Sequence, residues 1–291
     1  MHISKLTVST ALGLAVTACG GGSSVGSGTL NLNVTDAPID EAGKVVVTFS
    51  GVELQPADGE RIRIDFAETK QIDLLALQNG LSLPLLEGQE LASGRYNWLR
   101  LMLTEGGNYL TKYGDDAQYP LRIPSGAETG LKLVSGFVVP HGASADLIVD
   151  FDLRRSVHYA VGPAEYMLRP TLRLVDNAEA GAIAGSIDLT MTHDQACGPG
   201  NAVYVFAGAN VTPNDVNGKA PQPLTTALAH LADDGGCRYH AAFLPAGDYT
   251  VAFTAKAMTD DPVQNDDLAF APSATVPVTA GEISVHNFTM P

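Results

Sequence analysis

Two aspartates and an arginine in the segment VDFDLRRS have the residue types and the spacing that could do chemistry. Side chains alternate between the two faces of a β-strand, so a strand here places Asp150, Asp152 and Arg154 on one face, with the carboxylates about 7 Å apart. Such a pair can bind Ca²⁺ or serve as acid and base. It can equally form exposed ion pairs across a sheet, with Arg169 and Arg173 as partners.

The sequence favours the ion pairs, and Asp150 and Asp152 stay weak candidates for a metal site. No catalytic residue is assigned and no cofactor is expected, because no pattern places a nucleophile beside a base or metal ligands at a known spacing. A zinc site assembled from distant strands stays open. The histidines that could contribute to it are scattered: His141, His158, His193, His230, His240 and His286.

Three loops carry acidic residues without a known calcium-loop spacing. The segment TDAPIDEAG holds Asp36, Asp40 and Glu41 around a proline turn, where aspartate is common for backbone reasons alone. The loop from Asp260 to Asp267 could hold calcium, but its spacing matches no known loop. Asp215 imitates the middle of an EF-hand loop, which a proline at the first ligand position excludes.

Three tyrosines lie in a predicted hairpin that turns at residues 114–116. They are Tyr109, Tyr113 and Tyr119. Aromatic faces there could stack on sugar rings, but rings on a two-stranded ribbon more often pack against the sheet. An envelope glycan therefore stays open as a ligand, as does an envelope protein.

The first 28 residues predict export and anchoring. Residues 1–18 combine a basic start, an apolar stretch too short to span a bilayer and small residues before Cys19, which is typical of a secretory signal peptide. The segment VTAC resembles the lipobox of bacterial lipoproteins, whose cysteine is acylated, with palmitate for example, after the signal is cut. The resemblance implies a lipid anchor at Cys19, and the glycine that follows implies an outer-membrane address. Residues 19–28 then form the lipidated cysteine and a flexible tether.

The other two cysteines, Cys197 and Cys237, are an even number in an exported chain. We expect them to form a disulfide, which contributes about 4 kcal/mol in the chain-entropy account. A metal site is the competing interpretation, but neither cysteine has a partner at C-x-x-C spacing.

From Leu30 onward the hydrophobic residues repeat with a period of two, which predicts an all-β fold. Only residues 73–80 and 83–90 hint at helical turns. A fall in basic residues near 176–181 predicts two domains in tandem, an N-terminal β-sandwich at 29–176 and a C-terminal one at 181–291. The predicted strands include 60–66, 95–104, 117–123, 131–139, 144–153, 165–175, 183–191, 202–207, 237–244, 248–256, 274–279 and 282–289.

One short pattern occurs in both predicted domains, as LASGRY and LPAGDY. A glycine can take the positive φ of a tight turn, and the tyrosine two positions later can pack its ring while its hydroxyl stays in water. The longer segment LPAGDYTVAF resembles the turn and strand of prealbumin-like and carboxypeptidase-regulatory-like β-sandwiches. That likeness concerns the Ig-like fold and carries no function with it.

The N-terminal part is similar to a family of bacterial lipoprotein domains, domain of unknown function 4382. The segments that carry the resemblance follow one another in the family's order over about 29–175: LNLNVTDAP, FSGVELQP, IDLLALQNG, LASGRYNWLRLML, IPSGAETGLKL, SGFVV, DLIVDFDLRRSV and YMLRPTLRLV. Ser50 departs from the acidic residue expected before GVE. The resemblance implies a surface β-module and supplies no chemistry.

The net charge of −15 argues against nucleic acid as a partner, because such binding depends on clustered lysines and arginines. The leading hypothesis is a non-enzymatic binding or structural module, anchored by lipid in the bacterial outer membrane and facing the periplasm or the cell surface. The alternative is a metal-dependent or carboxylate-based hydrolase of envelope glycans or peptides that uses Asp150 and Asp152. The sequence leaves the oligomeric state open.

Overall fold

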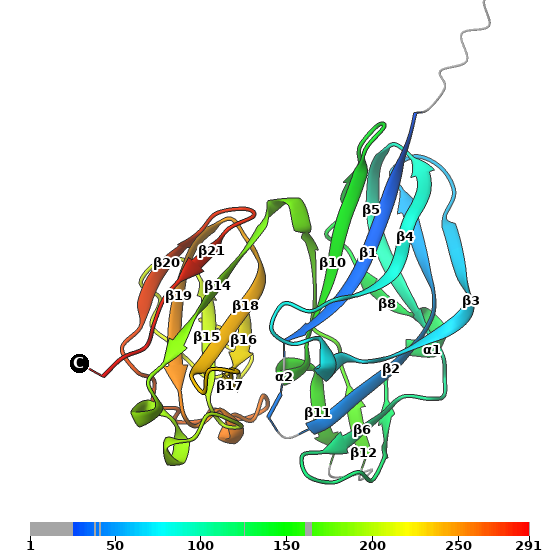
Figure 1. The fold of residues 1–291 in the computed structure, drawn as a ribbon. Coiled ribbons are helices and arrows are strands. Elements are labelled where there is room, and N and C mark those ends of the chain that lie inside the picture. Colours follow the sequence, from blue (N-terminus) through cyan, green and yellow to red (C-terminus); the bar gives the residue numbers. More distant parts are fainter. Residues whose placement is uncertain (1–25, 38, 41, 125, 161–164, 291) are drawn as a thin grey trace, which may run out of the picture.

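The computed structural model describes residues 26–290 except 38, 41, 125 and 161–164. The predicted signal peptide, Cys19 and most of the tether lie outside the described residues. The described chain is built mainly of strands, which form four sheets, and this confirms the all-β fold class (Figure 1). Two sheets use strands before residue 177 and two use strands after residue 179. No helix in the described part of the chain is long and apolar enough to cross a membrane.

The first two sheets face each other in the N-terminal region, which we define as residues 26–176. The four-stranded sheet has the order β13-β10-β1-β4, with β1 (Ser27–Ala37), β4 (Leu83–Ala92), β10 (Ser144–Asp152) and β13 (Leu172–Asp176). The nine-stranded sheet has the order β11-β12-β7-β6-β2-β5-β8, with β3 beside β2 and β9 beside β5. Its strands are β2 (Ala42–Pro56), β3 (Ile62–Asp73), β5 (Gly94–Leu103), β6 (Tyr109–Lys112), β7 (Tyr119–Arg122), β8 (Leu131–Leu133), β9 (Phe137–Val139), β11 (Val157–Ala160) and β12 (Glu165–Leu168).

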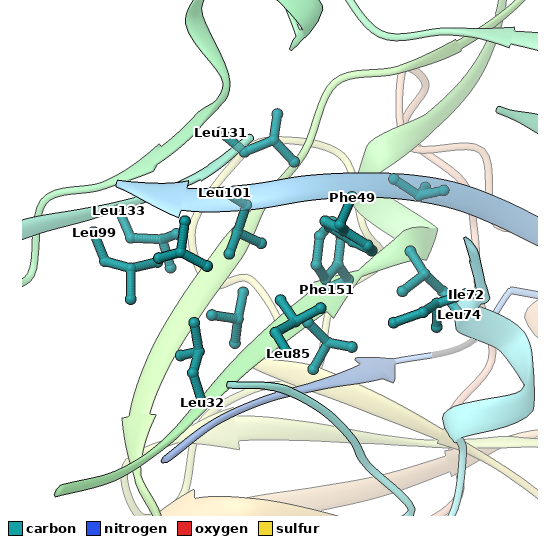
Figure 2. Packing of buried hydrophobic residues seen from close by; sticks show 14 of the residues in the cluster. Leu32, Phe49, Ile72, Leu74, Leu85, Leu99, Leu101, Leu131, Leu133 and Phe151 are labelled. Atoms are coloured by element: carbon teal, nitrogen blue, oxygen red, sulfur yellow. The ribbon is translucent and has the colours of Figure 1, made fainter. Parts of the chain in front are cut away.

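The apolar alternation that predicts the strands also builds the core between these two sheets. Leu32 on β1 and Phe151 on β10 point to the same side, because β1 and β10 pair in parallel register. Phe151 meets Phe49 of the opposite sheet edge to face, with ring centroids 6.1 Å apart (Figure 2). Such aromatic pairs contribute about 0.5–1.5 kcal/mol beyond their buried area.

The C-terminal region, residues 180–290, contains the other two sheets. One has the order β17-β18-β14-β21, with β14 (Ala180–Ile187), β17 (His230–Leu231), β18 (Cys237–Pro245) and β21 (Ile283–Val285). The other has the order β16-β15-β19-β20, with β15 (Ala202–Ala207), β16 (Thr225–Leu228), β19 (Gly247–Thr254) and β20 (Ala274–Val278).

The predicted disulfide is present in the C-terminal region. Cys197 and Cys237 are bonded with their Cα atoms 5.4 Å apart. Cys237 begins β18, so the bridge holds the loop around residue 197 against that strand. The cysteine count and the export prediction were therefore sufficient to identify this pair.

The recurring glycine-tyrosine turn is confirmed in both regions, with one correction. Gly94 and Gly247 have positive φ, at +138° and +159°. The hydroxyl of Tyr96 donates to the Ala92 carbonyl at 3.0 Å, and that of Tyr249 donates to the Pro245 carbonyl at 2.7 Å. The expectation that these hydroxyls stay in water is wrong, since both tyrosines are buried and a buried hydroxyl needs a partner.

Several predicted elements have different bounds in the structure. The strand expected at 144–153 ends at Asp152 and passes into the helical turn α2 (Leu153–Ser156). The helical hint at 83–90 is wrong, because this segment pairs with β1 as β4. The segments 131–139 and 165–175 are each split into two strands, and the strand expected at 183–191 ends at Ile187 as β14. The remaining helical turns are α1 (Gly126–Thr129), η1 (Leu74–Leu77), η2 (Asn177–Glu179), η3 (Leu189–Met191), η4 (His193–Gln195) and η5 (Ala257–Thr259).

Candidate functional site: a buried polar junction

The two regions meet along a surface that we call the junction. An apolar part of it contains Ile148 and Val175 from the four-stranded sheet of the N-terminal region, with Ala180 and the partly buried Phe243. Beside it, the imidazole Nδ1 of His240 lies 2.8 Å from the Asn79 carbonyl oxygen. The predicted carboxylates Asp150 and Asp152 are both buried beside this contact surface.

Asp150 forms the ion pair that the strand alternation predicts. It lies opposite Arg173 in the β10–β13 register, and its Oδ2 accepts from Nε of Arg173 at 2.9 Å and also from Nη2. Nη1 of the same arginine donates to the Phe243 carbonyl at 3.4 Å. The expected exposure of the pair is wrong, because the C-terminal region covers this face of the sheet.

Asp152 ends β10 and caps α2. Its Oδ1 accepts the backbone N–H of Arg155 at 3.1 Å, and the Arg155 guanidinium lies 3.6 Å from Oδ2. Aspartate at a helix N-cap is favoured because it satisfies a free backbone donor. Burial raises the pKa of Asp152 to about 7, although the Arg155 charge opposes the shift.

Arg154 does not share a strand face with Asp150 and Asp152, which corrects the sequence prediction. The turn of α2 directs its guanidinium into the junction, where Nη2 donates to Asp40 Oδ2 at 2.5 Å and Nη1 donates to the Ala257 carbonyl at 2.8 Å. Asp40 Oδ1 accepts the backbone N–H of Gly200 at 2.7 Å. The side chains of Arg154 and Asp40 are 4% and 0% exposed. One buried ion pair therefore binds backbone groups of the C-terminal region at two points.

The network continues into the C-terminal region through an aromatic ring. The Arg154 guanidinium carbon lies 5.6 Å from the ring centre of Tyr204, which is close enough for a cation–π contact. The Tyr204 hydroxyl donates to Asp260 Oδ2 at 2.5 Å, and the Val216 N–H donates to Oδ1 of the same residue at 3.1 Å. Asp260 thus lies at the far end of a chain of contacts that starts at Asp40.

The structure brings together two acidic segments that the sequence treats separately. One ligand oxygen from each of Asp215, Asp260 and Asp266 lies within 4.8 Å of the others. Asp215 accepts from the Asn217 amide and from the Asp266 N–H, and Asp266 accepts from the Asp261 N–H. These hydrogen bonds to loop groups explain why the three carboxylates lie close together.

Asp36 is the exception among the buried carboxylates near the junction. It lies near the end of β1, opposite Phe151 and two residues before the proline of the predicted turn, and it is 8% exposed. Neither of its oxygens has a hydrogen-bond partner among the residues that the structure describes. Burial raises the pKa of Asp36 well above its ordinary value, and the charges of Asp150 and Asp152 add to the shift. The nearby backbone N–H of Leu153 offsets part of this rise in the pKa of Asp36, although its position does not meet the geometry of a hydrogen bond.

The junction contains a small, partly open cavity near Asp150. The cavity has a volume of about 20 Å³ and is lined by Asp150, Thr226 and His240 among others. A space of this size holds about one water molecule. This cavity is therefore too small to hold a glycan or peptide substrate beside Asp150.

The tyrosine hairpin forms as predicted, and the ring of Tyr119 packs on Tyr166 of the neighbouring strand β12. Strands β6 and β7 pair in antiparallel register around the positive-φ residue Gly114. The ring centroids of Tyr119 and Tyr166 lie 5.7 Å apart, and Lys112 Nζ lies 4.8 Å from the Tyr119 ring. Tyr113, at 62% exposure, stays accessible.

Comparison with known proteins identifies the N-terminal region. The family described as Domain of unknown function (DUF4382) matches residues 27–170. This segment is a DUF4382 domain. The domain contains Asp36, Asp40, Asp150, Asp152 and Arg154, while the groups that Arg154 and Asp40 bind at Ala257 and Gly200 lie outside it. No curated protein sequence matches the chain.

Solved structures show only remote similarity to the chain that carries this DUF4382 domain. The TIE protein of Bacillus anthracis is 12% identical with a TM-score of 0.22, over 91% of this chain and 34% of that one. This chain thus spans about a third of that protein. The minor pilin GBS52 of Streptococcus agalactiae is 10% identical with a TM-score of 0.20, over 90% and 97% of the two chains. At such scores the similarity carries no argument about function.

Sequence reasoning identified Asp150 and Asp152 but missed the contact that joins the two regions. Asp40 and Arg154 are 114 residues apart, so no local pattern connects them. A local signal did exist for α2, because an aspartate followed by LRRS has the form of a capped helical turn.

Proposed function

We propose that the protein is a non-enzymatic envelope module, anchored by lipid at Cys19, in which two β-sandwich domains at 29–176 and 181–291 act as one rigid unit. The DUF4382 family has no described activity that could be transferred. The proposal therefore depends on the contacts that the buried polar groups make between the two regions.

The observation that carries the proposal is the Arg154 link. Relative motion is the usual expectation for two domains joined by a short connection. Here a buried arginine, held by Asp40 of its own region, binds a carbonyl of the other region, while Asp40 binds an N–H of that region. Separating the regions would leave both charges without these partners, which makes hinge motion costly.

The sequence supports the envelope location and the anchor. Acylation at a lipobox-like VTAC segment would hold the chain at a membrane surface through its Gly/Ser tether, and stable anchoring takes more than one acyl chain. An envelope glycan or an envelope protein is the ligand class that such a location provides. A rigid body at the end of a short flexible tether would present its outer sheet faces to that ligand.

The anchor is tested in bacteria that express the full chain, grown with an alkyne-tagged fatty acid. We expect Cys19→Ala to abolish labelling and to move the protein from the membrane fraction to the medium or periplasm. Ser24→Ala, a change in the same segment, should leave labelling intact. Unmodified wild-type protein free in the medium would contradict the anchor.

One observation favours the alternative hydrolase. A carboxyl group with a pKa of about 7, such as Asp152, can act as an acid or base near neutral pH. If Asp152 acts in this way, the variant Asp150→Asn/Asp152→Asn should lose metal binding or glycan and peptide hydrolysis and keep its melting curve. Our proposal expects the reverse result. The variant should melt at a lower temperature, because Arg173 loses a buried partner, and no hydrolysis should be lost.

A further inference from the structure

The outward face of the nine-stranded sheet carries the chain's single tryptophan. Trp98 lies on β5, where Arg100 is the next residue on the same face, and Lys132 lies opposite Arg100 on the neighbouring β8. The Arg100 guanidinium carbon lies 4.9 Å from the ring of Trp98, and Lys132 Nζ lies 4.5 Å from it. We call Trp98, Arg61, Arg100, Lys132 and Glu53 the Trp98 face.

The carboxylate of Glu53 on this face is less exposed to solvent than the cation of Arg61. Glu53 lies opposite Arg100 on β2 and accepts from its Nη1 at 2.6 Å, while Arg61 lies 3.6 Å from the other oxygen. The side chain of Glu53 is 11% exposed, whereas that of Arg61 is 59% exposed. Lys132 is also exposed. Two exposed cations, Arg61 and Lys132, therefore face solvent beside one exposed carboxylate, Glu60, on a chain whose net charge is −15.

The surroundings leave room beside the indole. Arg63 and Asp65 on β3 pair with each other at 2.8 Å and add no net charge. A surface hollow of about 520 Å³ next to the face is lined by Gln55, Gly59 and Glu60, together with Glu53 and Arg61. Gln55 lies directly opposite Trp98 in the β2–β5 register, so the hollow and the indole adjoin.

We propose that the Trp98 face binds an acidic polysaccharide, with a sugar ring on the indole, one uronate carboxylate on Lys132 and another on Arg61. An aromatic ring presents a flat apolar surface that suits the apolar face of a pyranose. A solvent-exposed cation–π contact is weak, while a charge-assisted hydrogen bond to a carboxylate is stronger. Lys132 therefore leaves the indole for the ligand's carboxylate and frees the part of the ring that it covers.

This inference names a ligand class for the binding role in the proposed function. It depends on that function only for bringing the protein near envelope glycans. The binding test uses purified full-length protein, so a failed anchor and a failed binding face give different results.

The single tryptophan makes the test specific for this face. Full-length protein in mild detergent is titrated with oligogalacturonate at low ionic strength, and Trp98 fluorescence is recorded. We expect a saturable change that the fully methyl-esterified oligosaccharide does not produce and that salt weakens. No change at saturating oligogalacturonate, or an equal change with the neutral ester, would overturn the proposal.

Variants separate stacking from charge. Calorimetric titration should show at least a tenfold loss of affinity for Lys132→Gln and for Trp98→Ala, while Lys256→Gln, in the C-terminal region, keeps the wild-type affinity. Lys132 is exposed, so its variant tests the face even if Trp98→Ala folds poorly. Polyglutamate that binds as tightly as oligogalacturonate would overturn the sugar-specific inference in favour of general polyanion binding.

Discussion

The surroundings of Asp36 and Asp40 differ sharply although the two residues are four positions apart. Both are buried, at 8% and 3% exposure. Asp40 receives a guanidinium from its own region and an N–H from the other, while neither oxygen of Asp36 has a hydrogen-bond partner among the described residues. The contrast teaches that burial alone does not tell whether a carboxylate stabilises the fold. The partner decides, and for Asp40 both partners come from distant parts of the chain.

Removing the partner of Asp40 should have the largest effect. Arg154→Met keeps the length of the side chain and leaves the buried Asp40 carboxylate with the Gly200 N–H alone. We expect the free energy of unfolding at pH 7 to fall by about 3–5 kcal/mol. Urea denaturation measures this loss.

The matched control is the next residue in the same turn. Arg155→Met removes a partly exposed guanidinium at 3.6 Å from Asp152 and should cost less than about 1 kcal/mol. Equal losses for the two variants would contradict the special role of Arg154.

A double variant sharpens the comparison by removing both charges. Asp40→Asn alone should also destabilise strongly, because the Arg154 cation then stays buried without its counter-ion. The combination with Arg154→Met should cost less than the sum of the single changes, by about 1–3 kcal/mol. Additive losses in urea denaturation would show that the two residues act independently.

Substitution of Asp36 is expected to raise the free energy of unfolding, whereas the substitutions above lower it. Its pKa in the folded protein is raised, so the folded state binds the proton more tightly than the unfolded state. Its charge therefore costs stability as the pH rises above the unfolded pKa and up to the folded one. Asp36→Asn should raise the free energy of unfolding at pH 7 by about 1–2 kcal/mol, with a smaller gain as the pH is lowered toward 4.

The control for Asp36 is an exposed aspartate in the turn after β2. Asp58→Asn should change the free energy of unfolding by less than about 0.5 kcal/mol at either pH. A loss of stability at pH 7 in Asp36→Asn would show that Asp36 has a partner after all.

The smallest effect is expected at Asp152, whose environment is intermediate. It has a backbone partner and a nearby guanidinium, yet burial raises its pKa from 3.8 to about 7. Stability from this group is therefore present below about pH 4 and lost as the pH rises through about 7. Asn also caps helices well, so Asp152→Asn should keep α2 and gain about 1 kcal/mol at pH 7 relative to pH 6. Equilibrium denaturation at the two pH values tests this.

Much of the fold was predictable from local pattern. The alternation of Leu30, Leu32 and Val34 and the glycine-tyrosine turns are short-range signals that depend on strand geometry and on positive φ. The disulfide needed only a cysteine count and a compartment. The short strand β17 was missed because two residues, His230 and Leu231, give no readable periodicity.

The candidate site was predictable only in part. The pairing of Asp150 with Arg173 follows from alternation on two strands of one sheet. The burial of that pair, the Asp40–Arg154 contact and the isolation of Asp36 all depend on how the C-terminal region covers the N-terminal one. Contacts between residues this far apart in the chain cannot be predicted from the pattern of a short sequence segment.

The rigid coupling of the two regions is the central claim, and hydrogen exchange with mass spectrometry across a urea series tests it most directly. Peptides from the β5 core, around Leu99, and from β15, around Val203, should lose protection at the same urea concentration in the full-length protein and at different concentrations in Arg154→Met. Separate midpoints in the wild-type chain, equal to those of Arg154→Met, would contradict the account.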